Sequence, residues 1–417
     1  MKNKKFYTLF VAVLLLCAIL FNTVSCTKIK ATDLMEDIEP QKVETRKDLS
    51  SSNADVTDFA LSLFKTSNEE GKNTLISPLS ILCALSMTAN GARGETLEQM
   101  EDVMGMTVEE LNLYLYSYMN SLPQSQKCKL NLANSIWFKD DKSFTANQDF
   151  LQTNADYYGA SLYKAPFDKS TLNGINDWVK EKTDGMIPKV IDEIPPEAVM
   201  YLVNALAFEA EWSDIYEKNQ VRDGTFTKED GTEQSAEFMY SEEHCYLEDE
   251  KATGFMKYYK GGNYAFVALL PNENVTVSEY LNSLDGESLN ALFSSTGGSV
   301  QAAIPKFETK YSAEMSEILK SMGMPLAFDE DNADFSGLGS SSAGNIYINR
   351  VIHKTFISVA EKGTKAGAAT VIEMATKGDS APNEIKRVYL DRPFVYMLVD
   401  CENNLPFFIG TMMDIEK

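Results

Sequence analysis

The segment from residue 364 to residue 377 sorts its charged side chains by position, and this pattern constrains the fold strongly. Every charge between residues 364 and 377 falls on an odd-numbered position. The uncharged even-numbered positions are Thr364, Ala366, Ala368, Thr370, Ile372, Met374 and Thr376. Because strand residues alternate between two faces, the segment is predicted to become a strand with one buried face. Its first half is small, so it can enter between strands that are already packed.

Length and composition predict one large packed domain. The chain has 417 residues, of which 44% are hydrophobic, and its net charge is −23. From about Asp55 onward, no stretch rich in Pro, Gly or Ser is long enough to separate two domains. A chain this acidic is repelled by phosphate backbones, so nucleic-acid binding is not expected.

The N-terminus has the features of an export signal. Lysines near the start precede an apolar run from residue 6 to residue 21, which is shorter than the roughly 20 residues of a membrane span. We predict a signal peptide over residues 1–25. Ser25 before Cys26 resembles a bacterial lipobox, so Cys26 is the predicted lipidation site; ordinary cleavage near Ser25, giving a soluble protein, is the alternative. Residues 26–50 are charged and aperiodic, which predicts a flexible tether before a domain over 51–417.

The remaining cysteines do not form a recognisable framework. Of six cysteines, Cys17 would leave with the signal and Cys26 would carry lipid. The other four could form two disulfides in three pairings, but they show no CxxC spacing, so free and mostly buried thiols are expected. These four are Cys83, Cys128, Cys245 and Cys401.

No arrangement of residues typical of an enzyme occurs in the sequence. There are two histidines, His244 and His353, and no GxSxG, HExxH or P-loop motif. His244 is followed directly by Cys245, so in a strand their side chains face opposite sides, and no spaced ligands accompany them. Acidic residues are abundant, as expected of a solvated acidic surface. We therefore predict no catalytic residues, no metal and no cofactor.

The hydrophobic patterns predict an α+β protein. Ser77-Pro78 is typical of a helix start, and the following run is apolar nearly all round, which predicts a buried helix that ends with a left-handed cap at Asn90-Gly91. Further helical periodicity occurs at 97–104, 108–120, 172–182 and 311–322. Strand-like runs occur at 199–209, 264–270, 301–307, 346–360 and 394–400. Helices gather in the first 190 residues and strands follow, so a βαβ repeat is not indicated.

Eight sequence stretches, in order and over residues 55–417, together resemble the serpin family. They are NTLISPLSILCALSMTANGARGETLEQM (73–100), LANSIW (132–137), INDWVKEKTDGMIPKVI (175–191), LVNALAFEAEW (202–212), IPKF (304–307), LKSMGMPLAFDEDNADFSGL (319–338), IYINRVIHKTFISVAEKGTKAGAAT (346–370) and DRPFVYMLVD (391–400). The resemblance implies a single domain with three β-sheets, about eight or nine helices and an exposed reactive loop. It also implies suicide inhibition of proteases, in which the cleaved loop inserts into the main sheet.

The resemblance assigns roles to particular residues. A buried polar cluster, the shutter, is expected to hold together the strands that must part, and it comprises Ser77, Ser80, Asn204 and His353. Trp212 matches the tryptophan where the loop begins to enter the sheet, a region called the breach. The loop hinge matches Glu361, Gly363, Thr364, Ala366, Ala368 and Thr370. Lys362 stands where the family often has Glu, which alters the charge of the hinge without blocking entry.

The position of the cleaved bond follows from the family's fixed loop length. Counting from Glu361 predicts cleavage between Lys377 and Gly378, and a lysine at this position implies trypsin-like targets. Met374, Ala375 and Thr376 offer alternative bait to elastase-like, chymotrypsin-like or cysteine proteases.

The resemblance also implies the wider setting of the protein. Target proteases are the expected partners of a monomer that meets membranes only through its lipid anchor. A bacterial cell-envelope or extracellular location is therefore expected. Two functions of other kinds stay open, a non-inhibitory serpin that carries or binds a partner, and a surface interaction protein whose loop is simply cleaved.

Overall fold

A computed structural model gives the architecture of the chain. It describes residues 31–123, 127–140, 144–196, 198–294, 297–342, 344–364 and 386–415. The signal peptide, Cys26 and the loop from residue 365 to residue 385 lie outside these ranges. None of the helices among the described residues combines the length and apolarity needed to cross a bilayer.

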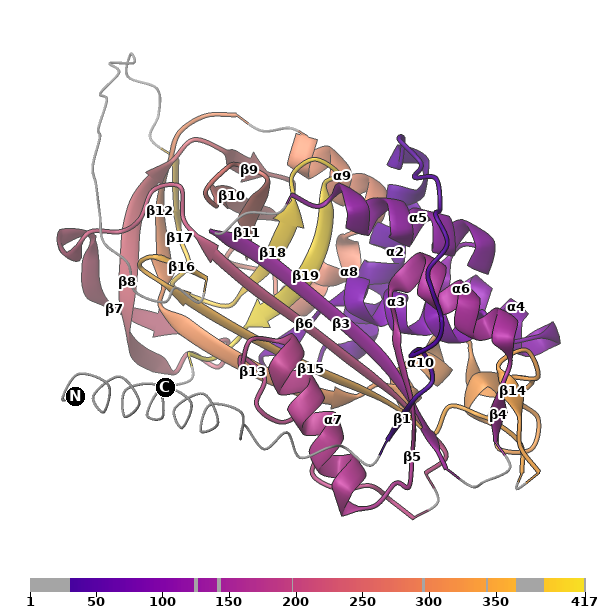
Figure 1. Cartoon of the computed structure of the whole chain (residues 1–417). Helices are drawn as coiled ribbons and strands as arrows, with labels where there is room; N and C mark the ends of the chain where they lie inside the picture. Colours follow the sequence, from indigo (N-terminus) through magenta and orange to yellow (C-terminus); the bar gives the residue numbers. More distant parts are fainter. Residues whose placement is uncertain are drawn as a thin grey trace, which may run out of the picture.

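The described residues form three β-sheets and a short two-stranded ribbon, as expected for an α+β fold with three sheets (Figure 1). In spatial order, the main sheet contains β1 (Thr32–Asp33), β5 (Ser161–Ala165), β3 (Cys128–Lys139), β6 (Met200–Glu211), β16 (Gly363–Thr364), β15 (Arg350–Ala360) and β13 (Phe307–Glu314). The second contains β2 (Thr74–Ile76), β19 (Leu405–Met412), β18 (Phe394–Asp400), β11 (Tyr264–Pro271), β10 (Ala252–Tyr258) and β9 (Tyr246–Glu248). The third contains β17 (Lys386–Tyr389), β12 (Val300–Pro305), β8 (Glu233–Glu243) and β7 (Val221–Thr227), and the ribbon pairs β14 (Gly339–Ser340) with β4 (Thr145–Ala146).

Nine α-helices lie in the described part of the chain, within the expected number. They are α2 (Ser50–Ser67), α3 (Pro78–Ala89), α4 (Gly94–Met104), α5 (Val108–Ser121), α6 (Gln148–Tyr158), α7 (Lys169–Lys182), α8 (Val277–Ser283), α9 (Gly286–Ser294) and α10 (Ser316–Met322). Two 3₁₀ turns, Lys218–Gln220 and Pro325–Phe328, complete the list. Helices α2 to α6 gather at one side, and α7 crosses the near face of the main sheet (Figure 1).

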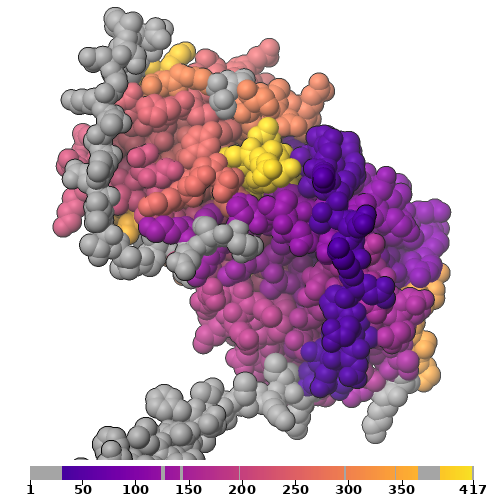
Figure 2. All heavy atoms as spheres, turned by 45° about the horizontal axis from the view of Figure 1, so that its top comes forward, coloured from indigo at the N-terminus to yellow at the C-terminus, as the bar shows by residue number. Residues whose placement is uncertain are grey.

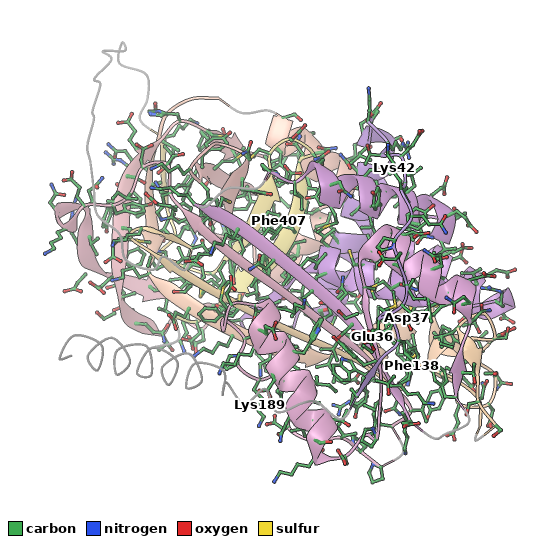
Figure 3. All side chains as sticks on the ribbon, viewed as in Figure 1. Glu36, Asp37, Lys42, Phe138, Lys189 and Phe407 are labelled. Carbon is green, nitrogen blue, oxygen red and sulfur yellow. The ribbon has the colours of Figure 1, made fainter. Side chains whose placement is uncertain are left out.

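The main sheet is buried on both faces by two separate cores. On one face, Phe208 of β6 packs edge-on against Tyr264 of β11 and lies 5.2 Å, centroid to centroid, from Phe407 of β19, and Figure 3 places Phe407 deep inside the molecule. On the other face, Ile175 and Trp178 of α7 join a smaller cluster against the sheet. Burial on both faces explains why β6 reads as a continuous apolar run.

The helix that carries the shutter serines is buried all round, which confirms the prediction from its sequence. All twelve residues of α3 are buried. The predicted left-handed cap is wrong, because Asn90 has φ −57° in the right-handed region. Gly91 is needed for space instead, since a Cβ there would lie 2.5 Å from the Cβ of Leu338.

Three predicted boundaries are wrong. Residues 311–314 continue β13, whose burial alternates along its length as it pairs with β15, so the helix begins only at Ser316. The run from 301 to 307 breaks at Lys306, between two strands of different sheets. The strand predicted from 346 begins at Arg350. In each case the pairing partner fixes the boundary.

The segment from residue 31 to residue 49 packs against the domain, in contrast to the free tether predicted from its charged sequence. The backbone N–H of Leu34 donates to the carbonyl of Leu162 at 2.9 Å, and the N–H of Arg46 donates to Ser117 Oγ at 2.7 Å. Leu34, Met35 and Ile38 pack on the core. Figure 2 shows this indigo segment running along one side of the molecule. A few apolar anchors therefore outweigh the polar composition.

Candidate functional site

The shutter is centred on Asn204, a fully buried side chain in the middle of β6. Its Oδ1 accepts a hydrogen bond from the Ser80 hydroxyl of α3 and faces His353 Nδ1 of β15 at 3.2 Å. Its Nδ2 donates to the Ser80 carbonyl and, at 2.6 Å, to Asn134 Oδ1 of β3. One amide thus ties three strands and a helix together, and its polar atoms are satisfied as burial requires.

His353 is held neutral between β6 and α3. Its Nε2 accepts the backbone N–H of Ser77 at 3.1 Å, so Nδ1 carries the proton that faces Asn204. Complete burial lowers the pKa of His353 to about 3, because the charged form loses its hydration. The ring is therefore neutral throughout the physiological pH range.

The predicted shutter residues are brought together, with one change of role and one addition. Ser77 acts through its backbone N–H, and its buried Oγ has no hydrogen-bond partner among the described residues. Asn134 belongs to the same network but was not singled out from the sequence. The motif LANSIW contains Asn134, and its even position places it on the same face of β3 as Leu132, which was the available signal.

Trp212 lies at the end of β6 and holds the hinge by its backbone. The indole Nε1 donates to the Ala360 carbonyl, and the Trp212 backbone N–H donates to the Lys362 carbonyl, both at 2.9 Å. Tyr216 donates its backbone N–H to the Glu361 carbonyl at 2.9 Å. The buried indole stacks on Tyr259 with ring centroids 4.4 Å apart. These contacts fix the turn where β15 ends and the reactive loop begins.

The first hinge residues already form a strand of the main sheet. Gly363 and Thr364 constitute β16, which pairs antiparallel with Val359 and Ala360 on one side and with Ala210 and Glu211 on the other. Thr364 is 1% exposed, and its hydroxyl contacts the Tyr259 hydroxyl. The inward parity predicted for Thr364 agrees with this burial, although the sequence did not indicate that entry begins before cleavage.

At the outer side of the hinge, Lys306 forms ion pairs with two glutamates. Lys306 Nζ lies 2.9 Å from Glu361 Oε1 and 3.0 Å from Glu237 Oε2. Burial raises the pKa of the Glu361 carboxyl, but the hydrogen bond from Lys306, a backbone hydrogen bond and the charges of Lys306 and Lys362 together outweigh burial and lower this pKa. The same bond to Glu361 raises the pKa of Lys306. The sequence analysis did not single out Lys306, although it lies in the motif IPKF.

A second, more buried ion pair supports Trp212 from below. Lys257 is 1% exposed, and its Nζ lies 2.8 Å from Glu243 Oε1. The same nitrogen lies 4.5 Å from the ring centroid of Tyr216 and 5.5 Å from that of Trp212. A cation over two aromatic faces fixes the positions of both rings. Trp212 and Tyr216, which bond to the hinge, are therefore held in place. We use the term breach for Trp212, Tyr216, Tyr259 and Lys306.

The other predicted site residues lie outside the described residues. They are Ala366, Ala368, Thr370, Met374, Ala375, Thr376, Lys377, Gly378 and the lipidation residue Cys26. Cys83, Cys245 and Cys401 are free thiols, and Cys83, Cys128 and Cys245 are buried. Among the described residues, no three His, Cys, Asp or Glu side chains gather to hold a metal, and His244 Nδ1 faces Ser299 Oγ at 3.3 Å.

Comparison with known proteins identifies the family to which the chain belongs. A family model described as Serpin (serine protease inhibitor) matches residues 54–415. The chain is 30% identical over 365 residues to an uncharacterized serpin-like protein of Methanosarcina acetivorans, covering 84% of this chain and 83% of that protein. It is also 30% identical to human Serpin B8, covering 84% and 96%. The chain therefore belongs to the serpin family.

Solved structures show the same fold. The native-state crystal structure of the thermophilic serpin tengpin has 48% sequence identity and a TM-score of 0.89, covering 93% of this chain and all of that chain. Against tengpin in its latent state the TM-score is 0.78, so the described residues match the native form better. Human thyroxine-binding globulin in complex with its ligand has 22% identity, a TM-score of 0.77 and coverage of 88% and 100%, which shows the fold alone. Membership of the family supports protease inhibition in general, and serpins are mostly inhibitors rather than enzymes.

Proposed function

We propose that this protein is a suicide inhibitor of serine proteases, with trypsin-like enzymes as its preferred targets. The observation that carries the proposal is β16, because a hinge already seated between β6 and β15 gives the rest of the loop a defined path. After acylation by the target, the loop would extend β16 along the sheet. Cysteine and elastase-like proteases are secondary targets.

The register of β16 supports a particular inserted state. Thr364 lies opposite Ala210 and Val359, so each further loop residue moves one position back along both neighbours. If the inserted loop kept this register, Thr370 would lie opposite Asn204 and His353, and its inward side chain would replace their direct contact. The path between the strands ends near residue 373 or 374, opposite Arg350 and Met200. Residues 375–377 would then leave the sheet, which accords with cleavage after Lys377.

The change of strand pairing gives a driving force for insertion. In the resting state β6 and β15 pair directly and in parallel, from Tyr201↔Arg350 to Ala205↔Lys354. An inserted loop would be antiparallel to both strands and would replace one short parallel ladder by two antiparallel ones. Each added backbone hydrogen bond contributes about 0.5–1.5 kcal/mol net, and antiparallel pairing is slightly more stable per residue. The free energy gained by insertion would deform the active site of the captured protease. Because a misplacement of about 1 Å in a catalytic site can slow the chemical step about 100-fold, deacylation would be slowed.

The test is a covalent complex with trypsin. Purified protein is mixed with trypsin, separated on a denaturing gel, and the released fragment is identified by mass spectrometry. We expect a band at the summed mass of trypsin and the chain up to Lys377, together with a released fragment that begins at Gly378. The Lys377→Ala variant should lose the complex with trypsin. Complete cleavage of the wild type without a complex would refute inhibition and would favour a loop that is simply cleaved.

We further propose that the protein is an exported lipoprotein, anchored to a bacterial envelope through Cys26. The proposal rests on the short apolar run after the first lysines and on Ser25-Cys26. Mass spectrometry of the mature N-terminus tests it, since a diacylated or triacylated Cys26 is expected. An unmodified N-terminus near residue 26 would instead indicate a freely secreted protein.

A further inference from the structure

The turn that leads into the hinge is bound through its backbone carbonyls by Trp212 and Tyr216, and these two residues are held differently. The backbone of Trp212 is itself fixed by a strand bridge to Tyr259. Tyr216 donates its backbone N–H to the carbonyl of Glu361 at 2.9 Å, but it lies outside any strand or helix, before the 3₁₀ turn Lys218–Gln220. The position of this N–H therefore depends on how the side chain of Tyr216 is held.

The hydroxyl of Tyr216 begins a hydrogen-bond chain that ends on a carboxylate. Ser241 Oγ donates to Glu243 Oε1 at 2.6 Å. Because a hydroxyl has a single hydrogen, the 3.2 Å contact between Tyr216 and Ser241 is a donation from the tyrosine to Ser241 Oγ. Burial and the negative charge of Glu243 raise the pKa of Tyr216, so its hydroxyl keeps the proton that this donation needs. Each bond in such a chain polarises the next one.

Lys257 neutralises the carboxylate and covers the ring of Tyr216. Its buried Nζ lies 2.8 Å from Glu243 Oε1 and 4.5 Å from the centroid of the Tyr216 ring. Lys257 belongs to β10 of the second sheet, whereas Ser241 and Glu243 belong to β8 of the third sheet. The side chain of Tyr216, which follows β6 of the main sheet, is thus held where residues of three sheets meet.

We propose that Lys257, Glu243 and Ser241 are positioning residues for loop insertion, which act by fixing Tyr216 against the hinge. The proposal rests on the protease inhibition proposed above. The bond from Tyr216 to the Glu361 carbonyl holds the turn that precedes β16, a strand of only two residues. With this bond intact, the start of the inserting strand is already in place when the target cleaves the loop. Without it, the loop must first regain β16, and the acylated protease has more time to deacylate and escape.

Amide exchange, measured without a protease, tests whether this network positions the hinge. The Lys257→Met/Glu243→Met variant, here called the network variant, leaves no unpaired buried charge and should therefore fold. We expect exchange at Thr364 to become about fivefold faster, the factor that corresponds to one net hydrogen bond. The control variant Lys228→Met/Asp414→Met removes a 3.0 Å ion pair directly after β7 and should leave Thr364 unchanged. Equal exchange in wild type and network variant, or equal acceleration in both variants, would overturn the proposal.

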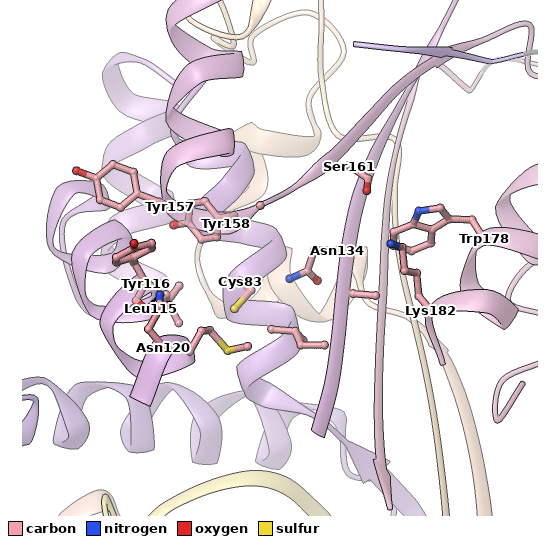
Figure 4. A pocket seen from close by; sticks show the side chains of 14 residues that line it. Cys83, Leu115, Tyr116, Asn120, Asn134, Tyr157, Tyr158, Ser161, Trp178 and Lys182 are labelled. Carbon is pink, nitrogen blue, oxygen red and sulfur yellow. Dashed lines mark hydrogen bonds between the residues drawn. The ribbon is translucent and has the colours of Figure 1, made fainter. Parts of the chain in front are cut away.

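Combined variants test whether the network acts through Tyr216. Tyr216→Leu removes the ring and the hydroxyl, so it should accelerate exchange at Thr364 about as much as the network variant does. Adding the network substitutions to Tyr216→Leu should change little, because both remove the same contact. Accelerations that multiply would overturn the route through Tyr216. Exchange at Asn134 of β3, which Figure 4 shows beside Cys83 of α3, should stay unchanged in every variant. Faster exchange there would indicate a general loosening of the main sheet and would also overturn the proposal.

The stoichiometry of inhibition tests the effect on function. With trypsin, the ratio of cleaved inhibitor to covalent complex should rise about fivefold in the network variant. The rate constant of the initial reaction should stay the same, because the residues that trypsin contacts are unchanged. A merely structural defect would lower the amount of folded protein without changing this ratio. An unchanged ratio would overturn the positioning role. Failure of the proposed function itself would be seen separately, as a wild-type protein that forms no complex.

Discussion

The shutter and the breach lie on the same strand, β6, but they hold the main sheet in different states. At the shutter β6 and β15 are neighbours, and Asn204 is paired directly with His353. At the breach β16 has already separated them, and Trp212 bonds to the entering segment itself. The sheet is therefore open at one end and closed in the middle.

The shutter and the breach also differ in the kinds of interaction that hold them. The shutter is a neutral network in which each group depends on Asn204, so parting the strands leaves several buried polar atoms without partners at once. The breach combines stacked aromatic rings with ion pairs, and its contacts to the hinge are mostly to backbone carbonyls. Apart from the ion pair of Glu361 with Lys306, entry at the breach thus depends little on the side chains of residues 360–362, whereas passage at the shutter requires a hydrogen-bonding substitute. In the proposed inserted state, Thr370 would be the residue that reaches the shutter.

The largest expected effect comes from closing the breach with a charge. Thr364→Arg would place a guanidinium at a position that is 1% exposed. Burying an unpaired charge costs several kcal/mol, so loop insertion should slow by more than about 100-fold and trypsin should cleave the variant as a substrate. The covalent complex on a denaturing gel is the measurement. The Lys362→Gln variant, which keeps the carbonyl that Trp212 binds, should still form the complex, and so would Thr364→Arg if the seat of β16 had no part in insertion.

The second effect comes from opening the shutter while the breach is left intact. Asn204→Ala removes the partner of Ser80, His353 and Asn134. An unpaired buried polar group costs about 1–3 kcal/mol, so a total destabilisation of about 3 kcal/mol is expected. The thermal midpoint at a fixed heating rate should fall accordingly. Asn131→Ala on β3, which loses an exposed bond to Asp184, should change the midpoint little. Equal midpoints for the two variants would show that the network does not hold the strands.

The sequence predicted the parts of this comparison that depend on periodicity. The apolar run after Ser77-Pro78 predicted a helix buried on every side, and α3 is such a helix. The parity of the hinge predicted that Thr364 faces inward, and its side chain is buried. Resemblance to the family brought Ser80, Asn204 and His353 into one network. These features follow from patterns within single segments.

Features that depend on a distant partner could not be predicted in this way. The role of Ser77 passes from its hydroxyl to its backbone because the position of His353 is set by β15. Lys306 becomes a hinge residue because a break between two strands brings it to Glu361. Residues 311–314 show helical periodicity and yet extend β13, because an eight-residue ladder with β15 outweighs local preference. The packing of residues 31–49 depends on Leu162 and Ser117, which lie far along the chain.

Lowering the pH should weaken the shutter selectively. The pKa of His353 is about 3 in the folded protein and 6.5 in its ordinary state, so the unfolded chain binds more protons between these values. Stability from this residue is complete above pH 6.5 and declines as the pH falls toward about 3. At about pH 5 the loss is about 2 kcal/mol, since each unit of pKa corresponds to about 1.4 kcal/mol. Thermal midpoints of wild type and His353→Gln are compared across this range. The variant should have the shallower slope, and parallel slopes would assign the pH dependence to other groups.

The smallest expected effect comes from expelling β16 by a methyl group. A Cβ at Gly363 would lie 2.0 Å from the carbonyl oxygen of Ala210, and φ is +151°. In the Gly363→Ala variant, β16 therefore cannot stay in its present position between β6 and β15. Gly262→Ala, with φ +74° and open space around its Cβ, is a control for backbone strain alone. Since β16 has two residues, the cost should be about 1.4 kcal/mol, seen as roughly tenfold faster amide exchange at Thr364 with Asn204 unaffected. If exchange at Asn204 rose equally, the breach and the shutter would open as one unit, and the sheet would have a single closed state instead of two independent ones.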